Sequence, residues 1–123
     1  MDKKDKSNPK DIIGVTKPSI GLIPPSALIL ESEAFKDGAR KYGAFNYRQT
    51  PVRASIYIDA ALRHLLSYLD GEQKTRDSGV DHRAAVRACM AILIDCEQTG
   101  NLIDDRPIKG TAAKLIEELT EKK

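Results

Sequence analysis

The sequence has no long apolar run and only two cysteines. A helix needs roughly 20 consecutive apolar residues to span a bilayer, and no segment approaches that length, so we expect no membrane insertion. No apolar stretch follows the charged N-terminal residues, as one would in a signal peptide. Cys89 and Cys96 lie on one predicted helix, roughly 10 Å apart along its axis, which is too far for a disulfide. We therefore expect a cytoplasmic protein with two free cysteines.

Charge of one sign is also lacking. The net charge is only +2, with 20 Lys and Arg residues against 18 Asp and Glu residues. Because the basic residues are scattered among acidic ones, the composition does not favour binding to nucleic acid. The sequence contains neither a GxxxxGK phosphate loop nor an HExxH zinc motif, and no serine or thiol arrangement typical of covalent catalysis. Several common types of catalytic site are thereby excluded.

Apolar residues at helical spacing predict four helices. These run from Ser26 to Gly43, from about Val52 to Gly71, from Asp81 to Gly100 and from Thr111 to the end of the sequence. No internal repeat or alternating strand pattern competes with them. The short connections predict an all-α fold, a four-helix bundle packed up and down. Residues 1–18 are polar and interrupted by proline and glycine, so we expect a flexible N-terminal arm followed by a single helical domain over residues 19–123.

Acidic and histidine side chains are predicted to gather at one end of this bundle. If the second and third helices are antiparallel, His64 lies within reach of His82, and the first helix brings Glu31 to the same end. The expected cluster comprises Glu31, His64, Glu72, Asp77, Asp81 and His82. The expected positions of Lys41, Tyr42 and Asn46 are at the other end of the first helix, and that of Asp59 is between the two ends.

This cluster favours metal-assisted phosphate chemistry. Carboxylates are hard oxygen ligands suited to Mg²⁺ or Mn²⁺, and magnesium usually binds through one or two of them together with substrate phosphates. A bound water is then the nucleophile, and Arg63 or Lys41 offsets charge on the leaving group, which describes phosphoanhydride hydrolysis. The alternative is structural: Glu72 and Asp77 also fit a solvated loop, and His64 fits a hydrogen-bonded histidine at the edge of the core.

Local structure accounts for further residues of the candidate set. Asp81 is well placed to cap the third helix. Asp59 and Arg63 are four residues apart, so a surface ion pair worth about 0.3–0.5 kcal/mol explains both. Lys41 lies in a last helical turn, where the helix dipole favours a cation. Asp59 and Asp95 interrupt apolar helical runs, and such charges are rarely buried without a partner or a metal.

Four segments in order carry a family resemblance: GLIPPSALI, DGARKYGAFNY, YIDAALRHLLSYLDGE and DSGVDHRAA. Together they cover about Lys17 to Cys96. The set resembles the phage dATP/dGTP diphosphohydrolase family, which is related to the MazG-like all-α nucleoside triphosphate pyrophosphohydrolases. Within that group it is similar to the MazZ type, found in bacteriophages that replace adenine with diaminopurine in their DNA.

The resemblance implies a fold, a reaction and an assembly. The fold is the helical bundle of the MazG-like type. The reaction is hydrolysis of a purine deoxynucleoside triphosphate, with dGTP as the expected substrate, to the monophosphate and pyrophosphate, with Mg²⁺ or Mn²⁺ as cofactor. In such a phage, dGMP is a precursor of the modified nucleotide, and the enzyme acts in the host cytoplasm. Relatives in the superfamily form dimers or tetramers with sites completed across subunits, so a homodimer or homotetramer is expected here.

The resemblance also suggests roles for the candidate residues. The expected metal ligands are Glu31, Asp59, Glu72, Asp77 and His82. The expected catalytic residues are Glu72, Arg63 and His64. The expected nucleotide-binding residues are Lys41, Tyr42, Asn46 and Arg63, of which Lys41 and Arg63 meet phosphate and the other two meet the base.

The chain departs from its superfamily at the metal motifs. The wider group places metal on ExxE in one helix and ExxD in the next, whereas the corresponding residues here are 61–64 and 82–85. In the closer family a second histidine and an asparagine often follow on the third helix, where this chain has Ala85 and Cys89. A helical module that binds or senses a nucleotide without turnover is therefore the alternative to an enzyme.

Overall fold

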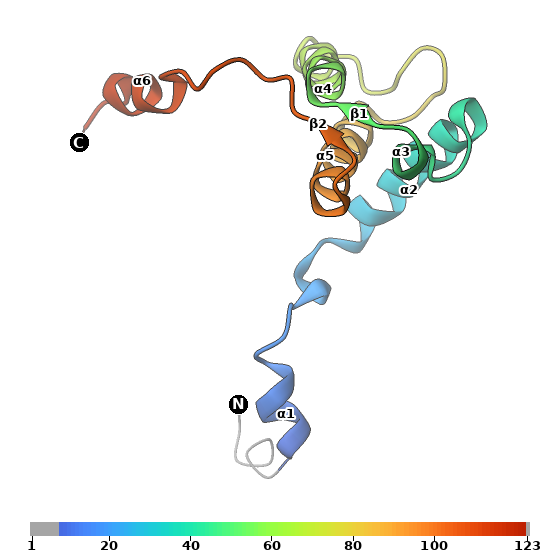
Figure 1. The fold of residues 1–123 in the computed structure, drawn as a ribbon, viewed down its shortest axis with the longest axis vertical. Helices are drawn as coiled ribbons and strands as arrows, with labels where there is room; N and C mark the ends of the chain where they lie inside the picture. The colour runs from blue at the N-terminus through green and yellow to red at the C-terminus, as the bar shows by residue number, and fades with distance from the viewer. Residues whose placement is uncertain (1–7, 123) are drawn as a thin grey trace.

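The structure, a computed structural model, describes residues 8–122 and is helical along most of its length (Figure 1). Its helices are α1 (Pro9–Gly14), the 3-10 turn η2 (Ile20–Leu22), α2 (Pro25–Tyr42), α3 (Asn46–Gln49), α4 (Ala54–Leu69), α5 (His82–Thr99) and α6 (Ala112–Leu119). Two short strands, β1 (Val52–Arg53) and β2 (Leu102–Ile103), pair in parallel. The predicted all-α class, of the MazG-like type, is confirmed, and the four predicted helices correspond to α2, α4, α5 and α6.

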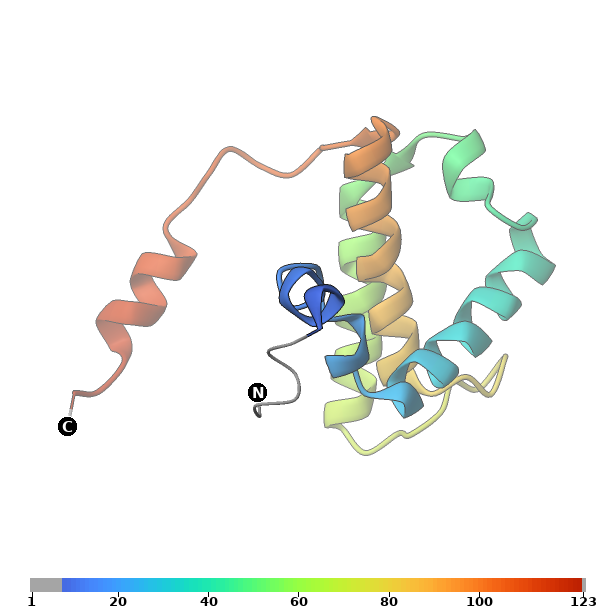
Figure 2. The ribbon, with the colours of Figure 1, turned by 90° about the horizontal axis from the view of Figure 1, so that it is seen from below.

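The helix α5 is central, because both α4 and α2 pack against it. α4 and α5 lie side by side as a helical hairpin, and α2 diverges from them at an angle (Figure 2). The buried residues at these contacts are mostly small: Ala54, Ala61, Ala84, Ala88 and Cys96. Small side chains allow close approach of the helix backbones, so the core is thin and most large apolar side chains remain partly exposed.

The ends of α5 follow from its flanking residues. Asp81 is the N-cap, and its side chain accepts a hydrogen bond of 2.8 Å from the backbone N–H of Arg83. Gly100 ends the helix in the left-handed conformation, with φ of 74°, which glycine adopts without a steric penalty. The predicted cap and the predicted end of this helix are both confirmed.

The connection between α2 and α4 contains structure that the sequence pattern did not predict. Instead of a loop, residues 46–49 form α3, and residues 52–53 pair with residues 102–103 beyond the end of α5. The amide group of Asn101 donates hydrogen bonds to the backbone carbonyls of Tyr47 and Thr50. These long-range contacts hold the α2–α4 connection against the end of α5.

The two terminal segments lie away from this core. α6 is separated from α4 and α5 in both views, rather than packed as the fourth helix of the bundle (Figures 1 and 2). In the expected flexible arm, residues 9–14 form α1, whereas residues 1–7 lie outside the described part of the chain. Within residues 8–122, no helix is both long enough and apolar enough to cross a membrane.

Candidate functional site

A chain of hydrogen-bonded side chains links α4, α5 and the loop between them. His82, on the first turn of α5 and only 4% exposed, bonds to Oε1 of Glu72 through Nε2 at 2.7 Å. Its other ring nitrogen lies 2.8 Å from Nδ1 of His64 on α4. The second carboxylate oxygen of Glu72 accepts a hydrogen bond of 2.8 Å from Nε of Arg76. The predicted meeting of His64, Glu72 and His82 is thus observed.

These contacts are consistent with one arrangement of donors and acceptors in the two histidine rings. The hydrogen bonds from His82 and then from Arg76 lower the pKa of Glu72, so its carboxylate is ionised and accepts a hydrogen bond from Nε2 of His82. In the tautomer of His82 that carries its proton on Nε2, Nδ1 of His82 is an acceptor, and Nδ1 of His64 is then the donor. Nε2 of His64 is left without a proton. Burial, the largest cause, lowers the pKa of His64, which favours a neutral form of this side chain.

Lys41 joins this site from the last turn of α2. Its ammonium lies 3.0 Å from a carboxylate oxygen of Asp37 and 3.3 Å from Oδ2 of Asp77 in the α4–α5 loop. Both hydrogen bonds, that to Asp37 first, raise the pKa of Lys41, so the side chain keeps its charge. We expected Lys41 at the opposite end of the helix from the acidic cluster, and this expectation is wrong because the α4–α5 loop extends across to the C-terminal half of α2.

Two adjoining cavities meet at these side chains. One, of about 420 Å³, is polar and is lined by Arg63, His64, Ser67, Glu72, Thr75, Arg76, Asp77 and His82. The other, of about 530 Å³, lies between α2, α4 and α5, and its lining includes Tyr42, Asn46, Tyr57, Ala88, Cys89 and Ile92. Both are lined by Arg63, His64, Thr75 and Asp77, so they form one continuous depression with a polar end and a largely apolar slot.

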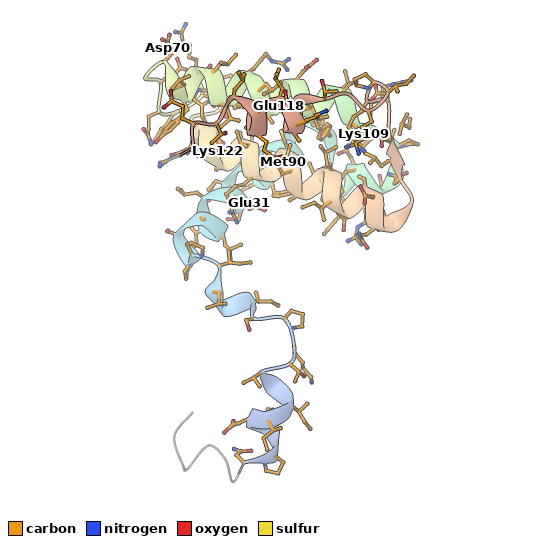
Figure 3. The ribbon with its side chains drawn as sticks, turned by 90° about the vertical axis from the view of Figure 1, so that its left-hand side faces the viewer. Glu31, Asp70, Met90, Lys109, Glu118 and Lys122 are labelled. Atoms are coloured by element: carbon orange, nitrogen blue, oxygen red, sulfur yellow. The ribbon has the colours of Figure 1, made fainter. Side chains whose placement is uncertain are left out.

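Two of the expected metal ligands lie outside this depression. Glu31 forms an ion pair with Arg87 at 2.8 Å, which ties α2 to α5. Figure 3 shows Glu31 on the part of α2 nearest the N-terminal segment. Asp59 is exposed on α4 and forms no ion pair within residues 8–122, so the expected Asp59–Arg63 pair is absent. By contrast, Asp95 does have a partner, because Arg48 of α3 binds it through two hydrogen bonds of 2.9 and 3.0 Å.

The carboxylates of a single chain do not form a closed metal site. Within the described residues, no three His, Cys, Asp or Glu side chains are grouped so that they could hold a metal ion. Of the five expected ligands, only Glu72 and His82 contact each other. Magnesium, however, commonly binds through one or two carboxylates and the phosphates of its substrate. Asp77, whose side chain is 74% exposed, is the more accessible of the two carboxylates that line the polar cavity.

Sequence reasoning did not include Tyr57, Thr75 and Ser78 among the site residues. Tyr57 lines the slot, and burial raises the pKa of its phenol. It precedes His64 by two helical turns, so the spacing alone could have placed both on one face of α4. The hydroxyls of Thr75 and Ser78 bond to each other in the loop. No periodic pattern indicates a loop conformation of this kind, because hydrogen bonds within the loop hold it, such as that from the backbone N–H of Thr75 to the carbonyl of Val80.

The helical fold defines a class, that of all-α proteins of the MazG-like type. Residues 7–106 match the family described as dATP/dGTP diphosphohydrolase, N-terminal. The chain therefore belongs to this family of nucleoside triphosphate hydrolases. No curated protein and no solved structure matches the chain. The family match includes every element from α1 to β2 and ends before α6.

Proposed function

We propose that the protein hydrolyses a purine deoxynucleoside triphosphate, with dGTP as substrate, to the monophosphate and pyrophosphate. The observation that carries the proposal is the continuous depression, polar at one end and apolar at the other, in a chain of this family. In a bacteriophage with a modified purine, the dGMP formed in the host cytoplasm would supply the precursor of that purine. The active form is a homodimer or homotetramer, which the large exposed apolar surface supports.

The slot suits a purine because of its lining. Tyr57, Ala88 and Ile92 present apolar surface from α4 and α5, and a planar aromatic base stacks well on such surfaces. Tyr42 and Asn46 line the same slot from α2 and α3, where their polar groups can bond to the edge of the base. This arrangement supports the expected roles of Tyr42 and Asn46.

The polar end suits a triphosphate. Arg63, Arg76 and Lys41 line or border it and carry the positive charge that phosphate oxygens require. Asp77, the exposed carboxylate at this end, would hold a Mg²⁺ or Mn²⁺ ion brought in with the substrate. When bound, this cation would offset charge on the phosphates, in addition to what the protein supplies.

The proposed step is attack by water on the phosphoanhydride bond between the α and β phosphates. A new bond forms between the water oxygen and the α phosphorus. The bond between that phosphorus and the oxygen that bridges to the β phosphate breaks, and pyrophosphate leaves. The proton released by the water passes to Nε2 of His64, which carries no proton in the tautomer that donates from Nδ1 to His82. Arg63, adjacent to His64, offsets the charge that develops on the leaving group.

The first test is a direct assay. The purified chain is incubated with each of the four dNTPs and with GTP, with Mg²⁺, with Mn²⁺ or with a chelator, and the products are separated by chromatography. We expect metal-dependent dGMP and pyrophosphate from dGTP. Turnover of a different nucleotide in place of dGTP would identify that nucleotide as the substrate. If no nucleotide is turned over, the proposed reaction is wrong.

The second candidate function is a module that binds a nucleotide without turnover. One observation favours it: the described residues contain no preformed group of three metal ligands. Titration calorimetry separates the two candidates, because binding of dGTP without products in the assay would support the module. Absence of both binding and turnover would contradict both.

A further inference from the structure

The helix α6 is too short to be stable without a packing partner. Helices below roughly 12–15 residues are marginal in water, and α6 has 8 residues. Its apolar side chains lie on one face and are largely exposed: Leu115 is 51%, Ile116 69% and Leu119 74% exposed. Glu118 and Lys122 mark this segment in Figure 3. An apolar face of this kind on such a short helix indicates that another surface covers it.

A matching surface is exposed on α4. Leu62, Leu66 and Leu69 recur at spacings of three and four residues, so they form one stripe along the helix. They are 51%, 63% and 82% exposed. An open hollow lined by Leu65, Tyr68, Leu69, Gly71 and Gln73 borders the stripe at the C-terminal end of α4. Within residues 8–122, no segment of the chain covers these leucines.

The accessible surface area of this chain is large for its mass, which supports an extensive interface with a partner. A compact monomer of 13.6 kDa exposes about 6,600 Å². This chain exposes 10134 Å². Obligate homodimer interfaces bury roughly 2,000–5,000 Å² counted over both copies, half of it on each copy, so the excess area of one chain is large enough to contain such an interface. A second copy of the chain is the occupant that supplies both a cover for the stripe on α4 and a surface for α6.

The start of the C-terminal segment is anchored so that it leaves the core. The carboxylate of Asp105 accepts hydrogen bonds from the backbone N–H and the hydroxyl of Ser55, at the N-terminal end of α4. From there the chain runs away from α4 and α5 to reach α6 (Figure 1). This path presents α6 to a neighbouring molecule and not to the stripe of its own chain.

We propose that α6 is an exchanged helix. In a homodimer of this chain, the face of α6 formed by Leu115, Ile116 and Leu119 packs on the leucine stripe of α4 in the second copy. In the same way, α6 of the second copy packs on α4 of the first. This inference deepens the proposed homo-oligomer by naming its contact, and it does not depend on hydrolase activity. Its test therefore measures association and not turnover.

The first measurement is the mass of the full chain in solution, by light scattering after size exclusion and by sedimentation. We expect at least a dimer for the wild type, and an increase of about tenfold or more in the dimer Kd for both Ile116→Asp and Leu66→Asp. The matched control is Lys114→Asp, which places the same acidic side chain on the opposite, exposed face of α6 and should leave association unchanged. A monomeric wild type, or variants that associate as the wild type does, would overturn the proposal.

A second measurement identifies which copy α6 contacts. The double variant Leu66→Cys and Ile116→Cys is treated with a short bifunctional maleimide and separated under denaturing conditions, beside the wild type with its native Cys89 and Cys96. Exchange predicts a product of twice the chain mass, absent from the wild type. A cross-linked product of single-chain mass would show that α6 folds back on its own α4, and no product would show that the two surfaces do not meet. Both results would overturn the exchange.

Discussion

The carboxylate of Glu72 determines the state of two histidines that follow it in the hydrogen-bonded chain. It accepts a hydrogen bond from Nε2 of His82, and in this tautomer Nδ1 of His82 accepts a hydrogen bond from Nδ1 of His64. A carboxylate is acceptor-only, whereas an amide presents both donors and an acceptor. The ring nitrogen of His64 proposed to take a proton from water therefore depends on a residue that lies one histidine away.

Glu72→Gln tests this dependence. The amide leaves the volume unchanged but removes the charge and the obligatory acceptor, so we expect kcat to fall by about 10²-fold or more. The Kd for dGTP should change little, since binding depends on the slot and on Arg63. Activity and calorimetry are measured side by side. The control is Glu33→Gln, the same change at an exposed position of α2. Full activity in Glu72→Gln would remove Glu72 from the mechanism.

The lowered pKa of His64 makes a prediction about stability and pH. Burial keeps this histidine neutral in the folded state, whereas the unfolded chain takes up a proton near the ordinary pKa of about 6.5. The stabilisation is therefore complete above that pKa and is lost as pH falls through and below it. Urea unfolding at pH 7.5 and 5.5 should show a smaller loss of unfolding free energy in His64→Gln than in the wild type. An equal loss in both proteins would show that His64 does not contribute.

At the scale of whole elements, the predictable features were those encoded within a few residues. The helices α2, α4 and α5 follow from apolar spacing, Pro25, Asp81 and Gly100, which act locally. The helix α3 and the β1–β2 pair were not predicted. They depend on the contacts of Asn101 with Tyr47 and Thr50, across a separation of about fifty residues that no local pattern reveals.

The same distinction explains the predicted site. The contact between His64 and His82 followed from an antiparallel helix pair and was predicted correctly. The positions of Lys41 and Glu31 relative to it depend on the angle at which α2 crosses α5 and on the path of the α4–α5 loop. Spacing along one helix contains neither quantity. For this reason, the ion pairs of Glu31 with Arg87 and of Lys41 with Asp77 could not be predicted from the sequence.

The N-cap of α5 gives a prediction for this element. Asp81 is 8% exposed and bonds to the backbone and the side chain of Arg83 and to Gln73. Loss of a capping side chain costs about 0.5–2 kcal/mol, so Asp81→Ala should lower the unfolding free energy by about that amount in urea. Asp81→Asn, which can still cap the helix, should lose less. If both variants lose equally, the charge of Asp81 and not its capping bond is the stabilising feature.

At the scale of the whole molecule, the slot exists because α2 and α4 both pack on α5 and leave a space that is lined by all three helices. The residues that line it from α5, Ala85, Ala88, Cys89 and Ile92, include three small side chains, which leave room for a ring. The size of these side chains should therefore control nucleotide binding without controlling the fold.

Cys89→Leu tests this control of binding by volume. Cys89 is half-buried in the slot, and a larger side chain there extends into the space proposed for the purine. We expect the Kd for dGTP, measured by calorimetry, to rise by about tenfold or more, equivalent to about 1.4 kcal/mol. The urea midpoint should stay close to that of the wild type, because the added atoms enter a cavity and not the packed core. Cys89→Ser, nearly equal in size to the original residue, is the control and should bind normally. Unchanged affinity in Cys89→Leu would place the base outside the slot, whereas a loss of affinity in both variants would assign the effect to the thiol and not to volume.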